Sequence, residues 1–112
     1  MFMIIAQYAV LAAPSIASIA EQRVPRGNAF TFSVTVSGTR TPLTLSVLSS
    51  SSESVLAVSA ITIDNGDGTA GSRTVTIADP SVLGTTNVVL RLTDGGNTVF
   101  DSNSFAITVA GE

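Results

Sequence analysis

The sequence predicts an all-β protein: a sandwich of about seven short strands in one domain, preceded by an extended N-terminal arm. Three observations lead to this prediction. Apolar and polar residues alternate with a period of two in several runs, Thr and Val fill those runs, and Gly, Pro, Asn and Asp separate them. No segment shows a sustained helical period. At 112 residues, the chain is long enough for one domain with its own core.

The first long strand is expected at residues 30–36, where two Phe and two Val alternate with Thr and Ser. Thr and Val are typical of strands because β-branched side chains pack well on a pleated surface. The same alternation predicts further strands at residues 43–47, 74–77, 88–92 and 105–109.

Turn residues separate these strands. The strongest turn signal is Asn65-Gly66 followed by Asp67-Gly68, because such pairs supply the positive φ angles that tight hairpins need. The polar run at residues 49–54 is expected to form a loop between strands. Further reversals are expected at residues 25–28, 37–42, 79–80 and 94–97.

Short strands at regular spacing with polar turns between them are the pattern of an immunoglobulin-like sandwich. The Cys and Trp residues that hold antibody domains together are absent from this chain. The core is therefore expected to depend on Phe30, Phe32, Phe105 and the aliphatic strand residues. At about 1.5–3 kcal/mol for each large buried side chain, such a core is sufficient for ordinary stability.

Composition narrows the classes of function. Without Cys the chain has no disulfide and no thiolate metal site, and without His it lacks the usual general base and the commonest metal ligand. The five basic residues are scattered arginines and the net charge is -3, so no basic patch is available for nucleic acid. We expect neither an enzyme nor a cofactor.

Three segments, at residues 14–38, 50–79 and 87–109, resemble the immunoglobulin-like and cadherin-like repeats of bacterial surface proteins and phage structural proteins. The resemblance covers nearly everything after residue 13. It implies a sandwich fold, and it implies little about function, since these modules serve as spacers, adhesins and decorations. In surface proteins they usually occur in tandem arrays, whereas this chain holds one copy.

Residues 1–13 form an uncharged apolar arm that a single sandwich does not need. The arm is too short for a transmembrane helix and is interrupted by Gln7. Three interpretations remain: a docking arm, a leader peptide with small residues at 11–13, and an extra strand of its own sandwich. For the docking arm, the candidate partner-binding residues are Phe2, Ile4, Ile5, Tyr8, Val10 and Leu11.

Two acidic turns have an alternative interpretation as calcium sites. Residues 64–68 resemble the start of a calcium loop, although the later Glu is missing and a hairpin needs the same residues. Asp94 and Asp101 flank another turn, and cadherin-like modules use such acids between repeats. Arg23 and Arg26 are candidates for contact with an acidic partner, with a solvent-facing role as the alternative.

We predict from these observations a non-enzymatic virion structural protein, a decoration or cement protein on the capsid surface. Its arm would dock onto the major capsid protein or onto neighbouring copies in a homo-oligomer. The alternative is a secreted bacterial surface protein, an adhesin or an appendage subunit. In that case residues 1–13 are either a processed leader or a donor strand that completes the next subunit.

Overall fold

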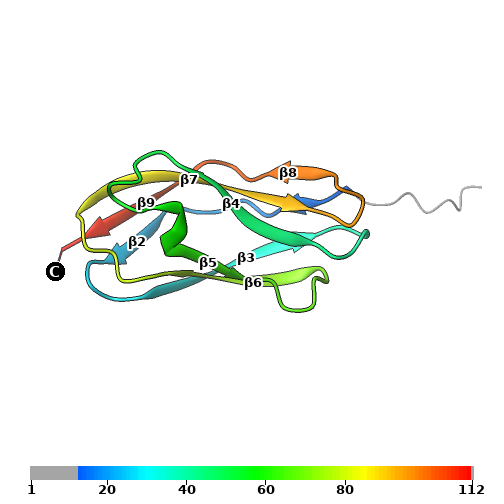
Figure 1. Cartoon of the computed structure of the whole chain (residues 1–112), viewed down its shortest axis with the longest axis horizontal. Coiled ribbons are helices and arrows are strands. Elements are labelled where there is room, and N and C mark those ends of the chain that lie inside the picture. Colours follow the sequence, from blue (N-terminus) through cyan, green and yellow to red (C-terminus); the bar gives the residue numbers. More distant parts are fainter. Residues whose placement is uncertain (1–12, 112) are drawn as a thin grey trace, which may run out of the picture.

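The computed structural model describes residues 13–111, which form two β-sheets packed face to face (Figure 1). Sheet A contains, in order, β1 (Ser15–Ile16), β3 (Phe30–Ser37), β6 (Gly71–Ile77) and β5 (Ile61–Asp64). Sheet B contains, in order, β2 (Gln22–Pro25), β9 (Phe105–Ala110), β7 (Gly84–Thr93) and β4 (Thr44–Ser50), and β8 (Val99–Asp101) also pairs with β7.

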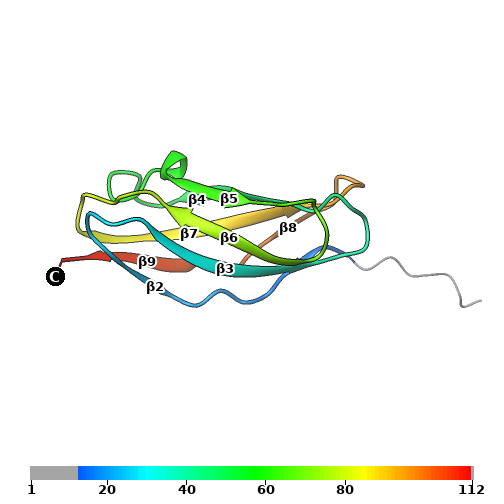
Figure 2. The ribbon, with the colours of Figure 1, turned by 90° about the horizontal axis from the view of Figure 1, so that it is seen from below.

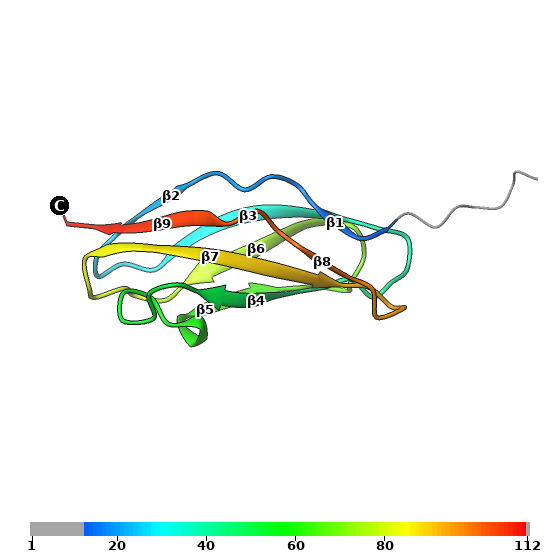
Figure 3. The same cartoon turned by 90° about the horizontal axis from the view of Figure 1, so that it is seen from above.

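The described residues form nine strands where about seven are predicted, because the first and last strands are each divided. β1 pairs with β3 in sheet A, and the chain then crosses to sheet B, where β2 runs parallel to β9 (Figure 3). β8 and β9 both pair with β7, and the register shifts by one residue between the pairs Arg91–Asp101 and Val88–Phe105. All other paired strands are antiparallel.

The five strands predicted from alternation are confirmed as β3, β4, β6, β7 and β9, and the predicted hairpin joins β5 to β6 (Figure 2). The prediction of a loop at residues 49–54 is wrong at its start, because Ser49 and Ser50 pair with Val89 and Val88 as the end of β4. A short 3₁₀ helix at Val58–Ala60 precedes β5.

The core lies between the sheets, and its aromatic part differs from the prediction. Phe105 is buried, whereas Phe30 and Phe32 are only half-buried and pack against the margin of the core. The rings of Phe32 and Phe105 meet edge to face with centroids 5.9 Å apart. Aliphatic residues fill the centre, and the largest fully buried side chains are Leu43, Leu45, Ile77, Leu90, Leu92 and Ile107.

The predicted partner-binding residues Phe2, Ile4, Ile5, Tyr8, Val10 and Leu11 lie outside the described residues, so their role stays a prediction. The described chain enters the sandwich at Pro14, whose backbone lies close against Gly38 beyond the end of β3. No helix among residues 13–111 is long and apolar enough to cross a membrane.

Candidate functional site

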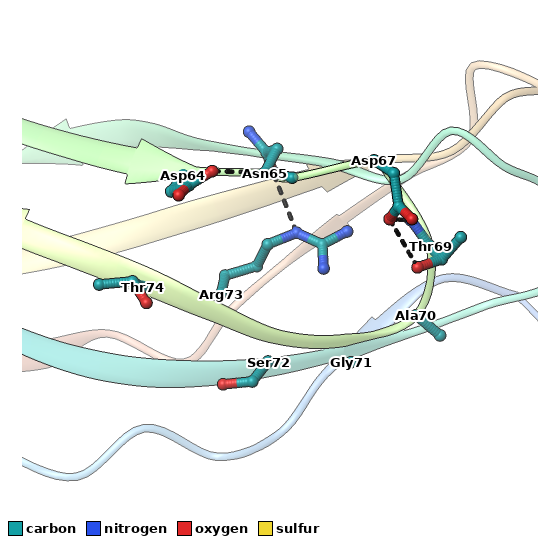
Figure 4. Close-up of a pocket in the computed structure, with 10 residues that line it drawn as sticks. Asp64, Asn65, Asp67, Thr69, Ala70, Gly71, Ser72, Arg73 and Thr74 are labelled. Atoms are coloured by element: carbon teal, nitrogen blue, oxygen red, sulfur yellow. Dashed lines mark hydrogen bonds between the residues drawn. The ribbon is translucent and has the colours of Figure 1, made fainter.

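The turn between β5 and β6 forms a polar pocket at one end of the sandwich (Figure 4). Asp64 Oδ1 accepts a hydrogen bond from the Gly66 N–H at 3.0 Å. Asp67 Oδ1 accepts from the Thr69 hydroxyl at 2.8 Å and from the Thr69 N–H at 3.2 Å. These bonds, the hydroxyl bond first, hold the pKa of the Asp67 carboxyl below its usual range. Both carboxylates therefore serve the turn, as the hairpin interpretation expects.

The second acidic turn, between β7 and β8, is built in the same way. Asp94 is buried, and its Oδ1 accepts hydrogen bonds from the Gly96 and Thr98 N–H groups, each at 2.9 Å. Asp101 instead forms an ion pair with Arg91, with Nε and Oδ1 2.7 Å apart. Each acid of the proposed calcium pair thus has a partner within the protein. No group of three or more acidic side chains able to hold a metal occurs among residues 13–111.

Arg73 and Asn65 connect the two sheets behind the hairpin. Arg73 is only 4% exposed, and it donates from Nε to Asn65 Oδ1 at 3.1 Å and from Nη2 to the Leu43 carbonyl at 3.0 Å. The Asn65 amide also pairs with the Leu45 backbone, accepting from its N–H at 2.8 Å and donating to its carbonyl at 3.1 Å. The side chain of Asn65 thereby occupies the place of a neighbouring strand along β4.

Neither residue was predicted in this role, since Arg73 is one of the five scattered arginines and Asn65 belongs to the predicted turn. One signal for Arg73 was present. It shares the period-two face of β6 with Val75 and Ile77, both fully buried, so the alternation itself directs this arginine inward. No local signal identifies the contact of Asn65, because Leu45 lies 20 residues away in the chain.

Arg23 and Arg26, the candidates for contact with an acidic partner, are both exposed. Arg23 lies on β2 at the edge of sheet B, and Arg26 follows in the turn after it. Their exposure is compatible with either interpretation, so contact with an acidic partner stays a prediction.

The open side of the sandwich between β4 and β5 contains a hollow of about 230 Å³ with mainly aliphatic side chains around it, which we call the side gap. β4 is the last strand of sheet B and β5 the last strand of sheet A, so the gap lies between two sheet edges (Figure 3). No charged side chain lines it. Its lining residues are Leu45, Ser46, Val47, Val58, Ile61 and Ile63.

The outer face of sheet A carries hydroxyl groups in regular rows. Across β3 and β6 the register places Thr31 opposite Thr76, Ser33 opposite Thr74 and Thr35 opposite Ser72. Apart from Thr76, which is half-buried, these side chains are exposed. Across β3 and β6 this face is therefore hydrophilic and uncharged, and the exposed Asp64 lies next to it on β5.

The sandwich resembles solved domains of bacterial surface proteins. The SrpA adhesin of Streptococcus sanguinis matches with a TM-score of 0.64 and 15% identity over 89% of this chain. The BIgI domain of the beta protein of S. agalactiae, in a structure bound to CEACAM1, matches with a TM-score of 0.56 and 21% identity over 88% of this chain. The fold is an immunoglobulin-like β-sandwich.

The likeness shows the fold alone, because each identity is low. This immunoglobulin-like chain spans 58% of the SrpA structure and 96% of the BIgI domain. It also matches the sialic acid binding region of the S. sanguinis SK1 adhesin, with a TM-score of 0.53, 15% identity, and coverage of 89% of this chain and 29% of that one. No family model and no curated protein matches the chain.

Proposed function

We propose that this chain is a non-enzymatic immunoglobulin-like module of a bacterial cell-surface protein and that it acts by binding protein. The observation that carries the proposal is the match of almost the whole sandwich to the SrpA adhesin and to the BIgI domain of the beta protein, the latter in a structure bound to CEACAM1. This is the alternative in our sequence analysis, and the neighbours favour it over capsid decoration, since none of those named here is a capsid protein.

The surfaces of the described residues support a binding role. The acids of both turns have partners within the protein, and the outer face of sheet A presents hydroxyl groups. Such a surface suits contact with another macromolecule, while the side gap offers an apolar site between two sheet edges. Capsid decoration stays a prediction that no feature of these residues favours over the surface location.

Antibody labelling of intact cells tests the proposed location. Antibodies raised against the full chain should label unpermeabilised cells of the source bacterium, and protease treatment of those cells should remove the label. An antibody against a cytoplasmic protein provides the control for cell integrity. Label that occurs only after lysis, or only on purified phage particles, would contradict the surface location, and the second result would return capsid decoration to first place.

A further inference from the structure

We propose that the side gap binds the apolar N-terminal segment of a second copy, residues 2–11, as a strand that pairs with β4 at Val47. This self-association goes beyond the proposed surface function and does not depend on it. Three features support this arrangement: the backbone groups that face the gap, the side chains that line it, and the place where the described chain enters the sandwich.

The backbone groups on the outer edge of β4 point away from β7. Gly68 and Arg73 bond to the N–H and the carbonyl of Leu43 from that side. Asn65 bonds in the same way to the N–H and the carbonyl of Leu45. Backbone groups two residues apart on a strand point to the same side. The N–H and carbonyl of Val47 therefore also point away from β7, toward the gap.

The register on β7 supports this orientation. Leu90 lies opposite Val47, and its N–H and carbonyl are both bonded to Ser102 on the far side of β7, at 2.9 and 2.8 Å. Val47 and Leu90 are thus a pair that exchanges no backbone hydrogen bonds. The polar groups of Val47 are available to a strand that enters the gap.

The facing edge of β5 has the same character. The Ala78 N–H donates to the Ala60 carbonyl, so these two residues form a hydrogen-bonded pair. Hydrogen-bonded and non-hydrogen-bonded pairs alternate along an antiparallel ladder, so the next residue of β5, Ile61, directs its N–H and carbonyl away from β6. Ile63 follows two residues later and directs its N–H and carbonyl toward the gap. An added strand on β4 would therefore lie beside a second edge with free backbone groups.

The side chains of the gap lack the charges and prolines that protect many exposed edges, and the register of β4 shifts only after Val47. Natural edges carry Lys, Pro or inward charges that prevent a foreign strand from pairing. Residues 45–47, which line the β4 side, include no charge and no proline, and residues 61–63 on the β5 side include none either. The hollow of about 230 Å³ has room for a large apolar side chain of the added strand.

The N-terminal segment has the composition that such a site selects. Residues 1–12 carry no charge and include aromatic and β-branched residues, which are common in strands. In an extended conformation these residues would span about 40 Å, more than the gap requires. Along a strand, one face would present Phe2, Ile4, Tyr8 and Val10.

The sheet order favours a second copy over the same chain. β1 and β5 are the opposite edges of sheet A, so the segment starts about 14 Å, three strand spacings, from its own gap. β1 is antiparallel to β3 and Ser15 pairs with Ser37, the last residue of β3. The described chain therefore enters at that end of the sandwich, across the width of sheet A from its own gap.

Cysteine cross-linking tests this arrangement, since the chain has no native cysteine. Single variants Ala6→Cys, Gln7→Cys and Ala9→Cys of the full chain are each mixed with a tagged Ser46→Cys chain under mild oxidation. The matched control is Ser33→Cys, the same substitution at an exposed position on the outer face of sheet A. At least one arm position should give roughly tenfold more mixed disulfide with Ser46→Cys than with the control.

Equal yields with Ser46→Cys and Ser33→Cys would overturn the proposal. A chain carrying both Ala6→Cys and Ser46→Cys provides the test for the same-chain arrangement. Intramolecular disulfide in that chain, without the intermolecular product in the mixtures, would overturn the second copy as the occupant. Intermolecular disulfide in both experiments supports it.

Light scattering after size exclusion gives an independent measurement. The full chain should associate as its concentration rises, and Ile63→Asp should weaken that association by roughly tenfold through a charge in the gap. Thr62→Asp, which places the same charge on the outer face of the same strand, should associate like the parent. Val47→Pro removes an N–H that faces the gap and serves as a second variant if Ile63→Asp fails to fold. Association unaffected by every gap variant that folds would overturn the proposal.

Discussion

Asparagine side chains replace missing strands on both open sides of this sandwich. On one side Asn65 pairs with the backbone of Leu45 on β4. On the other, Asn103 accepts from the Ile19 N–H at 2.9 Å and donates to its carbonyl at 3.0 Å. A carboxamide carries one acceptor and one donor group in the spacing of a peptide unit, so it satisfies both groups of an edge residue. This pairing satisfies backbone groups that would otherwise be left without protein partners.

Asn65→Ala should lower the free energy of unfolding by about 2–3 kcal/mol, because it leaves the N–H and carbonyl of Leu45 and the Nε of Arg73 without their partner. Asn87→Ala, at an exposed side chain on β7, is the matched control and should change stability by less than about 0.5 kcal/mol. Urea denaturation of the two variants measures both values. Equal losses would show that the Asn65 amide contributes nothing specific.

The ion pair between Asp101 and Arg91 should make the stability of the fold depend on pH in the acid range. The hydrogen bond of Asp101 with Arg91, together with the charge of that arginine, lowers the pKa of Asp101 in the folded chain. A lowered carboxyl pKa stabilises the fold at pH values above the unfolded pKa, and the contribution is lost as pH falls through the folded pKa. The parent should therefore melt slightly higher than Asp101→Asn at pH 7, and the two melting temperatures should converge as the pH falls through the lowered pKa of Asp101 in the folded chain. Since both partners are exposed, 0.5 M salt should reduce the difference at pH 7.

At the scale of elements, the β5–β6 hairpin joins two strands of sheet A and also bonds to the segment that leads into β4 of sheet B. The Gly68 carbonyl accepts from the Leu43 N–H at 2.7 Å, and Arg73 reaches the Leu43 carbonyl from the following strand. The hairpin of sheet A thus fixes the start of β4 in sheet B. Two glycines of the hairpin, Gly66 and Gly68, both have positive φ, but only Gly68 lies close against another segment, so substitution at each position should have a different effect on stability.

Gly68→Ala should destabilise the protein by about 2–4 kcal/mol and Gly66→Ala by about 1 kcal/mol. Both residues have positive φ, +84° at Gly68 and +56° at Gly66, so both substitutions strain the backbone. At Gly68 the new methyl group would also lie 2.9 Å from Pro42 Cβ, whereas at Gly66 nothing lies within 4 Å. Thermal melting of the two variants measures the difference, and equal losses would mean that the hairpin is not clamped against Pro42.

At the scale of the whole molecule, the buried residues of both sheets form one continuous core, so we expect the sandwich to unfold as a single cooperative unit. The chain has no cysteine to form a disulfide, and the buried side chains of the described residues are mainly aliphatic, so packing of these side chains stabilises the core. The side gap lies at the margin of this core, where β4 and β5 have no further strand to pair with.

Leu90→Ala should cost about 2–5 kcal/mol, since Leu90 is 0% exposed in the middle of β7. The neighbouring Val89→Ala, on the outer face of the same strand, should cost much less. Denaturation followed by circular dichroism and by binding of an apolar dye should give coincident transitions for the parent and both variants. Separate transitions would show that the sheets unfold independently.

The sequence by itself determined the fold class, five of the strands, the hairpin and the positions of the reversals. These features depend on neighbours only two to four residues apart, because alternation and turn chemistry are local properties of the backbone. The burial of Arg73 was available from the same alternation. The half-burial of Phe30 and Phe32 was not, since alternation says which face a residue is on and not how far the opposite sheet extends.

Only the tertiary structure decided the division of the first and last strands, the asparagine pairings and the side gap. Each depends on residues far apart in the chain: Asn103 and Ile19 are separated by 84 positions and Asn65 and Leu45 by 20. The gap exists because the order of strands leaves β4 and β5 as the last members of their sheets on the same side of the sandwich. Strand order is set by how the two sheets pack their apolar faces, and no local pattern of residues encodes it.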